Sequence, residues 1–205
     1  MAADTGDRPL VGVLALQGGF GAHARVLTEL GAEVREVRTP ADLEGLDGLV
    51  MPGGESTTMT LGIAREGLAE PLRAFHRRGR PIFGTCAGLI MLDRNHLGLM
   101  DIVAERNAFG RQLHSFEADV ELPDIGTFHA VFIRAPWIAE YGPAVEILAE
   151  VDGHPVAARQ GPMLVVSFHP ELTGDTRLHD AFLKQVRAGG SVSKPSPPRS
   201  ARARR

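Results

Sequence analysis

The first half of the chain alternates between short apolar runs and longer segments with helical spacing. Continuous apolar runs cover residues 10–16 and 46–51, and a third run ends at Gly84. Runs of this kind are typical of strands buried on both faces of a parallel sheet. Between them, apolar residues three or four positions apart at 21–30 and 61–75 predict amphipathic helices. The order strand, helix, strand, helix predicts an α/β fold with an open, mostly parallel, doubly wound sheet.

The second half of the chain has a different pattern, in which shorter runs with partial alternation are joined by turns that contain Gly or Pro. We expect these runs to be antiparallel strands added to the sheet. They cover residues 102–106, 116–122, 128–134, 145–151, 156–159 and 163–168. A last amphipathic helix is predicted from Leu178, Phe182 and Val186, because their spacing places them on one face.

The hydrophobic pattern predicts one domain at residues 10–188, after a flexible N-terminus at 1–9. With 205 residues, of which 43% are hydrophobic, the chain can bury a substantial core. The stretch 189–205 is rich in Ser, Pro and Arg and holds five basic residues and no acid, although the whole chain has a net charge of −3. This composition predicts a disordered basic tail.

Composition and charge also exclude several classes of function. The net negative charge argues against a nucleic-acid partner, and no apolar run approaches the roughly 20 residues that span a membrane. A single cysteine excludes an internal disulfide and agrees with a reducing compartment. Because the N-terminus also has no secretion signal, we expect a cytoplasmic protein.

The most informative stretch is Gly84-Thr85-Cys86-Ala87-Gly88, which lies between an apolar strand and an apolar helix. Gly-x-Cys-x-Gly is the cysteine form of a nucleophile elbow, in which small neighbours permit a strained turn that exposes the side chain. A thiol at a helix N-terminus also meets the positive end of the helix dipole. The alternative is a small buried hydrophobic residue, which is what a lone cysteine often is.

A second candidate element is the turn at residues 52–58, Pro-Gly-Gly-Glu-Ser-Thr-Thr, which directly follows a predicted strand. Two glycines leave backbone N–H groups uncovered, and such groups can hold an anion or a developing oxyanion. The simpler interpretation is a tight turn in which Ser56 or Thr57 caps the next helix. Both interpretations can hold together.

His169 and Glu171 follow the apolar strand at 163–168. If the chain stays extended there, residues two apart point the same way, so that the carboxylate can orient the imidazole beside a thiol nucleophile. Four other histidines are interpreted as surface or satisfied polar residues, namely His23, His76, His154 and His179. We expect no metal site, because neither Cys-x-x-Cys nor His-x-x-x-His spacing occurs.

Two arginines near predicted strand ends are candidates for binding a carboxylate. Arg106 ends the strand at 102–106, and Arg134 ends the strand at 128–134. A guanidinium can hold a carboxylate through two parallel hydrogen bonds. Surface salt bridges are the alternative, and spacing does not decide between the two.

Taken together, these motifs give the chain a resemblance to the class I, triad-type glutamine amidotransferases, and within them to the glutaminase subunits of pyridoxal 5′-phosphate synthase. The resemblance covers roughly residues 10–186. The wider class is carried by residues 84–88 and 169–171. The narrower assignment rests on the motifs at 16–18, 52–58, 105–112, 115–117, 131–136 and 156–161. The chain departs from the family in having Gly21-Ala22-His23 where Arg-Glu-His is usual, and in a shorter segment between Leu92 and His96.

The resemblance implies a flavodoxin-like fold and a Cys-His-Glu triad that hydrolyses L-glutamine. Cys86 would be the nucleophile, His169 the base and then the acid, and Glu171 the orienting carboxylate. The oxyanion would be held by the backbone N–H groups of Gly54 and Ala87. The residues implied to bind glutamine are Gly54, Glu55, Ser56, Arg106, Ile133 and Arg134.

The resemblance also implies a partner. Ammonia would pass through a tunnel to a separate (β/α)₈-barrel synthase subunit in a hetero-oligomer, which makes pyridoxal 5′-phosphate from ribose 5-phosphate and glyceraldehyde 3-phosphate. Pyridoxal phosphate would be a product, and the chain itself would need no cofactor.

Three alternatives compete with this hypothesis. The first is a class I glutaminase that supplies another synthase, such as one for imidazole glycerol phosphate, purines or cobyrinic acid. The second is a thiol hydrolase or peptidase of related fold, which would need no partner. The third is a non-catalytic binding module, which the filled triad positions argue against.

Overall fold

The structure is a computed structural model of the whole chain, and it describes residues 8–106 and 115–190. Most of the predicted flexible N-terminus and of the predicted basic tail lies outside the described residues, as does the part of the 105–112 motif after Arg106. The last helix ends at Gly190, two residues beyond the predicted end of the domain.

A central sheet organises the fold. Among the described residues it has seven strands in the order β2-β1-β3-β4-β11-β10-β9. The first five are parallel, and β10 and β9 are added in antiparallel orientation. This order of the parallel strands is that of flavodoxin-like sheets, so the predicted fold class is confirmed. The strands are β1 Leu10–Leu14, β2 Glu33–Val37, β3 Gly48–Met51, β4 Ile82–Thr85, β9 Glu146–Val151, β10 His154–Gln160 and β11 Met163–Val166.

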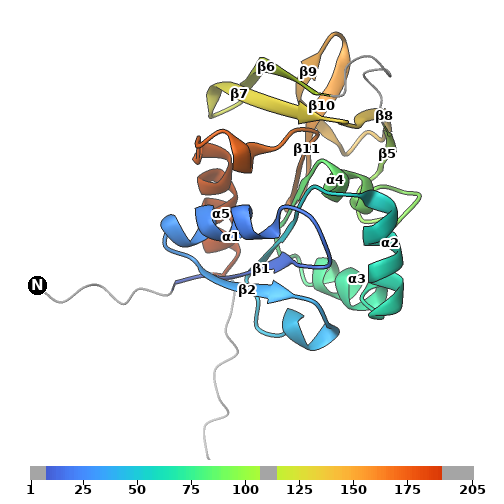
Figure 1. Cartoon of the computed structure of the whole chain (residues 1–205), viewed down its shortest axis with the longest axis vertical. Helices are drawn as coiled ribbons and strands as arrows, with labels where there is room; N and C mark the ends of the chain where they lie inside the picture. Colours follow the sequence, from blue (N-terminus) through green and yellow to red (C-terminus); the bar gives the residue numbers. More distant parts are fainter. Residues whose placement is uncertain (1–7, 107–114, 191–205) are drawn as a thin grey trace, which may run out of the picture.

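Helices cover both faces of the parallel part of the sheet (Figure 1). Helices α1 (Phe20–Glu29) and α5 (Arg177–Gly190) lie side by side on one face, and α2 (Ser56–Arg65), α3 (Ala69–Arg77) and α4 (Ala87–Leu92) lie on the other. Two short 3₁₀ helices, η1 (Pro40–Leu43) and η2 (Pro170–Leu172), occur in the connections. The η1 helix begins at Pro40, because the fixed φ of proline suits the first position of a helix.

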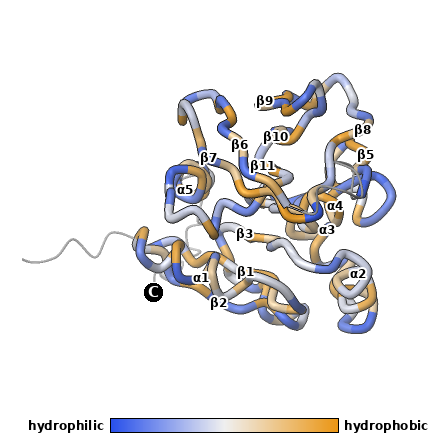
Figure 2. The backbone as a smooth tube through the Cα atoms, turned by 45° about the horizontal axis from the view of Figure 1, so that its top comes forward, coloured by the Kyte–Doolittle hydropathy of each residue, from blue (hydrophilic) through white to orange (hydrophobic). Residues whose placement is uncertain are grey.

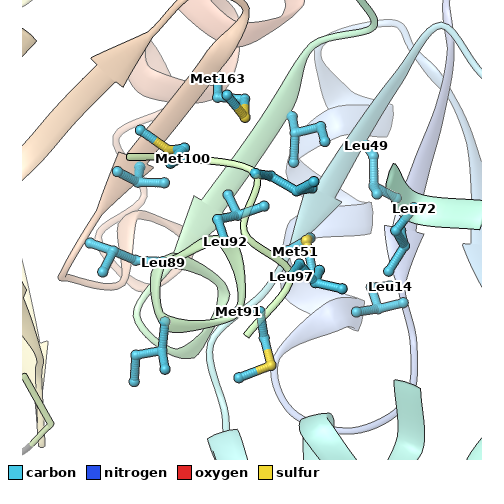
Figure 3. Close-up of a cluster of buried hydrophobic side chains, with 14 of the residues drawn as sticks. Leu14, Leu49, Met51, Leu72, Leu89, Met91, Leu92, Leu97, Met100 and Met163 are labelled. Carbon is cyan, nitrogen blue, oxygen red and sulfur yellow. The ribbon is translucent and has the colours of Figure 1, made fainter. Parts of the chain in front are cut away.

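Two hydrophobic clusters fill the layers between sheet and helices. Figure 2 shows hydrophobic residues on the central strands and alternating polar and apolar positions along the helices outside them. Figure 3 shows one cluster, in which leucines and methionines of β3, β11, α3 and α4 meet on one face of the sheet. The second cluster lies beneath α1 and α5 and includes Phe83, Phe168 and Phe182. Because helices cover both faces of the sheet, the sequences of the central strands β1, β3, β4 and β11 are continuous apolar runs.

The structure corrects the sequence analysis in the second half of the chain. Strand β11 is parallel to β4, not antiparallel. Four further strands form two separate pairs instead of joining the sheet, namely β5 (Ile102–Glu105) with β8 (Trp137–Tyr141) and β6 (Ser115–Leu122) with β7 (Gly126–Ile133). Strand β8 was not predicted at all. Strand partners are set by long-range contacts, which a local pattern does not contain.

The helical spacing at 61–75 belongs to two helices, not one. Helix α2 ends at Arg65, and α3 starts at Ala69. Gly67 lies between them with φ of +65°, a left-handed conformation that stops a helix and that glycine adopts without strain. The hydrophobic period continues across the break because both helices pack on the same face of the sheet.

Candidate active site

Cys86 occupies a sharp turn between β4 and α4. Its φ of 48° lies in the left-handed region, which is uncommon for a residue with a side chain and marks local strain. The flanking residues Gly84 and Gly88 are required by close packing, because a side chain at either position would meet neighbouring backbone atoms. A Cβ on Gly88 would lie 1.9 Å from the carbonyl oxygen of Met51, and one on Gly84 would lie 3.0 Å from that of Gly88. The Gly-x-Cys-x-Gly pattern therefore allows α4 to pack directly on β3 and β4.

The parallel pairing of β4 with β11 brings the predicted base to the thiol. Thr85 pairs with Val166, and the Cys86 N–H donates to the Val166 carbonyl at 2.9 Å. His169 follows three residues later and donates its backbone N–H to Val131 of β7 at 2.9 Å. Both residues therefore lie at the carboxyl edge of the sheet, where open α/β sheets bind ligands.

His169 and Glu171 form the predicted pair, but on a different backbone. The distance from His169 Nδ1 to Glu171 Oε1 is 2.8 Å, and the carboxylate is only 2% exposed. The chain is not extended there, because Glu171 lies in η2 and His169 precedes it as the N-cap. Pro170 at the first position favours this helical turn. The predicted partner is thus correct, and the predicted i, i+2 geometry is wrong.

The charges of this group support a thiol nucleophile. Burial acts against the charged form of His169, but Cys86 and Glu171 outweigh it and raise the pKa of His169 to about 10. Burial likewise acts to raise the pKa of Glu171, but the His169 hydrogen bond and the facing histidines lower it below its usual value. The site therefore favours an imidazolium between a carboxylate and the Cys86 side chain. A histidine held in this way is the usual partner of an activated cysteine.

A pH titration tests this arrangement. The raised pKa means that protonated His169 adds stability that is fully present below its ordinary value of 6.5 and is lost as the pH rises toward about 10. We expect the His169 imidazole resonance to titrate near the raised value in the wild type and closer to 6.5 in Cys86→Ala, as measured by NMR. Wild-type titration near 6.5 would contradict the arrangement.

One cavity collects the predicted site residues. It has a volume of about 380 Å³, within the roughly 300–1,000 Å³ typical of small-molecule sites. Of the predicted residues, all except Glu171 line it, and Glu171 lies behind His169. Two further residues line it, Gln17 and Ile90. The lining residues that were predicted are Gly54, Glu55, Ser56, Cys86, Ala87, Arg106, Ile133, Arg134 and His169.

The turn after β3 forms one wall of this cavity. A Cβ on Gly53 would lie 2.5 Å from His169 Cε1 and 3.1 Å from Cys86 Cβ, so only glycine fits against the two side chains. Gly54 has φ of +151° and packs against Gln17, whose side chain donates to the Glu55 carbonyl at 3.1 Å. The two glycines thus permit a close approach of backbone to the thiol and imidazole.

The cap of α2 differs from the simple prediction. Glu55 is the N-cap, rather than Ser56 or Thr57, because the helix begins at Ser56. Its carboxylate accepts from the N–H groups of Thr57 and Thr58 at 3.1 and 2.7 Å. These hydrogen bonds, led by those from Thr58, lower the pKa of Glu55 to about 2. Glu55 therefore carries a fixed negative charge at the cavity wall.

The two predicted arginines both face this cavity. Arg134 has φ of 45°, a strained conformation that turns the chain after β7. The Arg106 guanidinium nitrogen Nη2 lies 3.2 Å from His96 Nε2. The other ring nitrogen, His96 Nδ1, lies 2.7 Å from Oδ1 of the buried Asp93. The cavity thus has cationic groups from two separate strand ends, which supports the carboxylate-binding interpretation over isolated surface salt bridges.

Sequence reasoning assigned no role to two buried histidines that lie behind Glu171. His23 of α1 and His179 of α5 are both fully buried and hydrogen-bonded to each other, so they match the satisfied polar interpretation and not the surface one. A usable signal was their helical phase. His23 is four positions before Leu27, and His179 is three positions before Phe182, so both lie on apolar faces.

Two other kinds of feature are absent from the part of the chain that the structure describes. Across residues 8–106 and 115–190, no group of three His, Cys, Asp or Glu side chains is arranged to hold a metal ion. In the same ranges, no helix has the length and apolar character needed to cross a membrane.

Comparison with known proteins places the chain among glutamine amidotransferases. The profile of the SNO glutamine amidotransferase family matches residues 13–188. A Clavibacter sepedonicus protein named pyridoxal 5′-phosphate synthase subunit PdxT is 52% identical over 200 residues, covering 92% of this chain and 96% of the relative. A Geobacillus kaustophilus protein of the same name is 55% identical over 191 residues, covering 89% and 97%.

Solved structures agree with this placement. A crystal structure described as a glutamine amidotransferase is 47% identical, with a TM-score of 0.82 and coverage of 86% of this chain and 98% of that one. The structure of PurLQS from Thermotoga maritima is 17% identical, with a TM-score of 0.66 and coverage of 89% and 97%, and supports the fold alone. The resemblance predicted from the motifs is therefore confirmed, and the chain belongs to the SNO glutamine amidotransferase family.

Proposed function

We propose that the chain is the glutaminase subunit of a pyridoxal 5′-phosphate synthase, which hydrolyses L-glutamine to L-glutamate and ammonia. One observation carries the proposal. Cys86 and His169 share a single cavity with the residues implied to bind glutamine, and Glu171 supports His169 from behind. The names of the relatives with about 50% identity support the same assignment.

Acylation begins with attack of the Cys86 thiolate on the side-chain amide carbon of glutamine. The C–N bond breaks as the His169 imidazolium gives its proton to the leaving nitrogen, which departs as ammonia. A γ-glutamyl thioester remains on Cys86. The raised pKa of His169 suits it to this acid step, because the proton is present when the thiolate attacks.

Deacylation reverses the role of His169. The neutral imidazole takes a proton from water, the hydroxide adds to the thioester, and the C–S bond breaks to release glutamate and the Cys86 thiolate. Glu171 holds Nδ1 throughout, which keeps the other ring nitrogen toward the reacting atoms.

The oxyanion of both steps is held by the backbone N–H groups of Gly54 and Ala87. Ala87 is the first residue of α4, and the first N–H groups of a helix have no partner within the helix. Gly54 lines the same cavity from the opposite loop. Loss of one such donor typically lowers the rate about 10²–10³-fold.

The charges of the cavity match the two ends of a free amino acid. Arg106 and Arg134 supply cations for the glutamine carboxylate, and Glu55 supplies a permanent anion for its ammonium. Ser56 and the Ile133 backbone complete the contacts. A peptide amide would lack one or both of these end charges, which favours glutamine over a peptide substrate.

The proposal includes a partner and a location. Ammonia passes to a (β/α)₈-barrel synthase subunit in a hetero-oligomer, which uses it with ribose 5-phosphate and glyceraldehyde 3-phosphate. The glutaminase domain occupies residues 10–188, in agreement with the family match at 13–188. A cytoplasmic location fits the single cysteine of the chain.

Glutamate release from L-glutamine, with and without the barrel subunit, tests the function. We expect slow release by the chain alone and faster release with the partner, because the glycine turn at 52–54 can move and the partner sets its oxyanion geometry. Full activity without any partner would contradict this activation and favour an independent hydrolase. Stimulation by a different synthase would favour another class I glutaminase.

A further inference from the structure

Behind the catalytic carboxylate lies a chain of buried polar groups from three separate elements. Glu171 Oε2 is 3.3 Å from His23 Nε2 of α1. His23 Nδ1 is 2.9 Å from His179 Nε2 of α5, and His23 Nε2 is 3.2 Å from the Thr85 hydroxyl at the end of β4. Both imidazoles are fully buried. Neither ring lines the cavity, and His23 contacts the site through Glu171 and through Thr85, the residue before Cys86.

The second carboxylate oxygen of Glu171, Oε2, requires a hydrogen-bond donor, and His23 is the neighbour that can provide one. Oε1 accepts from His169, whereas Oε2 is buried and has no hydrogen-bond partner of good geometry among the described residues. A buried, unpartnered carboxylate oxygen is costly. His23 Nε2 is the ring nitrogen that faces it, which makes His23 the natural donor to Oε2.

The hydrogen-bond pattern selects one tautomer for each ring. A neutral imidazole has one N–H donor and one acceptor nitrogen. If His23 carries its proton on Nε2, that N–H lies between Glu171 Oε2 at 3.3 Å and the Thr85 hydroxyl at 3.2 Å. Its Nδ1 then accepts from His179 Nε2–H. The only nitrogen then left over is His179 Nδ1, which has no partner in the described part of the chain and remains a bare acceptor. The reverse tautomers would put a lone pair against the carboxylate and bury an unpaired N–H, which native proteins rarely do.

The charges around His23 agree with a neutral donor. Burial lowers the pKa of His23, and the nearby His169 lowers it further, against the opposing effect of Glu171. Burial, followed by His23, lowers the pKa of His179 to about 3. The groups facing His23 are Glu171 of η2, His169 before it, His179 of α5, Thr85 of β4 and the edge of Phe83. The negative charge of Glu171 therefore remains available to His169.

We propose that His23 is a positioning residue for the glutaminase reaction, held in its Nε2–H form by His179, and that it fixes the second oxygen of Glu171 so that the first stays on His169 Nδ1. This inference rests on the proposed function, because its effect is exerted on the His169 acid and base. The buried polar groups come from α1, β4 and α5, which are far apart in sequence: His23 and His179 are 156 positions apart.

His23→Leu and His23→Gln, each with the barrel subunit present, test the role. Leucine fills the space without a donor, and we expect kcat to fall about 10–100-fold with KM little changed. A glutamine side-chain N–H reaches the position of Nε2, and we expect His23→Gln to restore kcat to within about 5-fold of wild type. His76→Gln of α3 is the matched control and should behave as wild type, because His76 is partly buried but lies outside the cavity.

The single cysteine provides a second readout that needs no glutamine. Iodoacetamide alkylates a thiolate with loss of iodide, so the rate against pH reports the Cys86–His169 pair alone. When His23 no longer holds Glu171, the carboxylate stabilises the His169 imidazolium less. We therefore expect the pH midpoint of alkylation to move up by about one unit in His23→Leu but not in His23→Gln. A purely structural defect would lower the amount of reactive protein without moving the midpoint.

Each outcome separates the positioning role from the function. A wild-type midpoint and kcat in His23→Leu would overturn the proposal, as would a loss of kcat that glutamine does not rescue. If wild type releases no glutamate with its partner while the midpoint still shifts, the proposed function fails and the positioning of Glu171 stands. If His23→Leu does not fold, His179→Phe takes its place and should shift the midpoint in the same direction, because His23 then loses the donor that sets its tautomer.

Discussion

Replacing Cys86 by alanine is expected to abolish partner-stimulated glutamate release, with a loss of roughly 10⁴-fold or more. Cys86 is the proposed nucleophile and adjoins a charged imidazole at the cavity wall, and the chain has no other cysteine that could replace it. Without it no thioester forms, and only slow direct attack of water remains. The measurement is glutamate production with the barrel subunit at saturating glutamine.

Thermal unfolding of Cys86→Ala is the control, because it shows whether the variant is still folded. Cys86 is buried but lies at a cavity wall, so removing the sulfur should change the midpoint of thermal unfolding only slightly. Glutamine binding without turnover should persist, because the charged groups at the cavity wall remain. Glutamate release that survives in Cys86→Ala would contradict the thiol mechanism.

Replacing Gly88 by alanine is expected to have the largest effect on stability together with a large effect on activity. The added Cβ would lie 1.9 Å from the Met51 carbonyl oxygen, and a backbone atom cannot rotate away as a side chain can. We expect a loss of about 3 kcal/mol in the free energy of unfolding, at the upper end for overpacking, and a fall in Tm of about 6–12 °C.

The same substitution should displace the Cys86 thiol. Gly88 is two residues after Cys86 in the first turn of α4, so moving α4 away from β3 shifts the thiol relative to His169. A displacement of about 1 Å typically lowers kcat about 100-fold. Thermal unfolding and glutamate release of the purified variant measure the two effects.

Gly21→Ala is the matched control. Gly21 lies in α1 with no atom within 4 Å of an added Cβ, and alanine is the better helix former there. We expect unchanged or slightly higher Tm and unchanged glutamate release by the free chain. Equal stability losses in Gly21→Ala and Gly88→Ala would show that the close contact with Met51 is not the cause.

Much of the site was predictable because its signals are local. The strand before Cys86, the small residues around it and the glycine turn at 52–54 are each contained within a few positions of the sequence. The pairing of His169 with Glu171 was also predicted, although by way of an extended chain that the structure replaces with η2. The correct partners were found because a residue two positions away is within reach in either conformation.

The failures share a different origin. The orientation of β11, the separate β5–β8 and β6–β7 pairs and the strand β8 depend on which segments meet across the fold. Apolar runs look the same in parallel and antiparallel strands. The break between α2 and α3 was missed because the hydrophobic period continues through Gly67.

The sequence by itself determined the alternation of strands and helices in the first half, the turn that carries Cys86 and the family to which the chain belongs. Only the tertiary structure decided that β11 runs parallel to β4, which carries His169 to Cys86, and that His23 and His179 meet Glu171 in the interior. The physical reason is the distance along the sequence over which each interaction acts. Backbone propensity and side-chain period act over a few residues, whereas the partner of a buried polar group is chosen by contacts among elements that the chain brings together only when it folds.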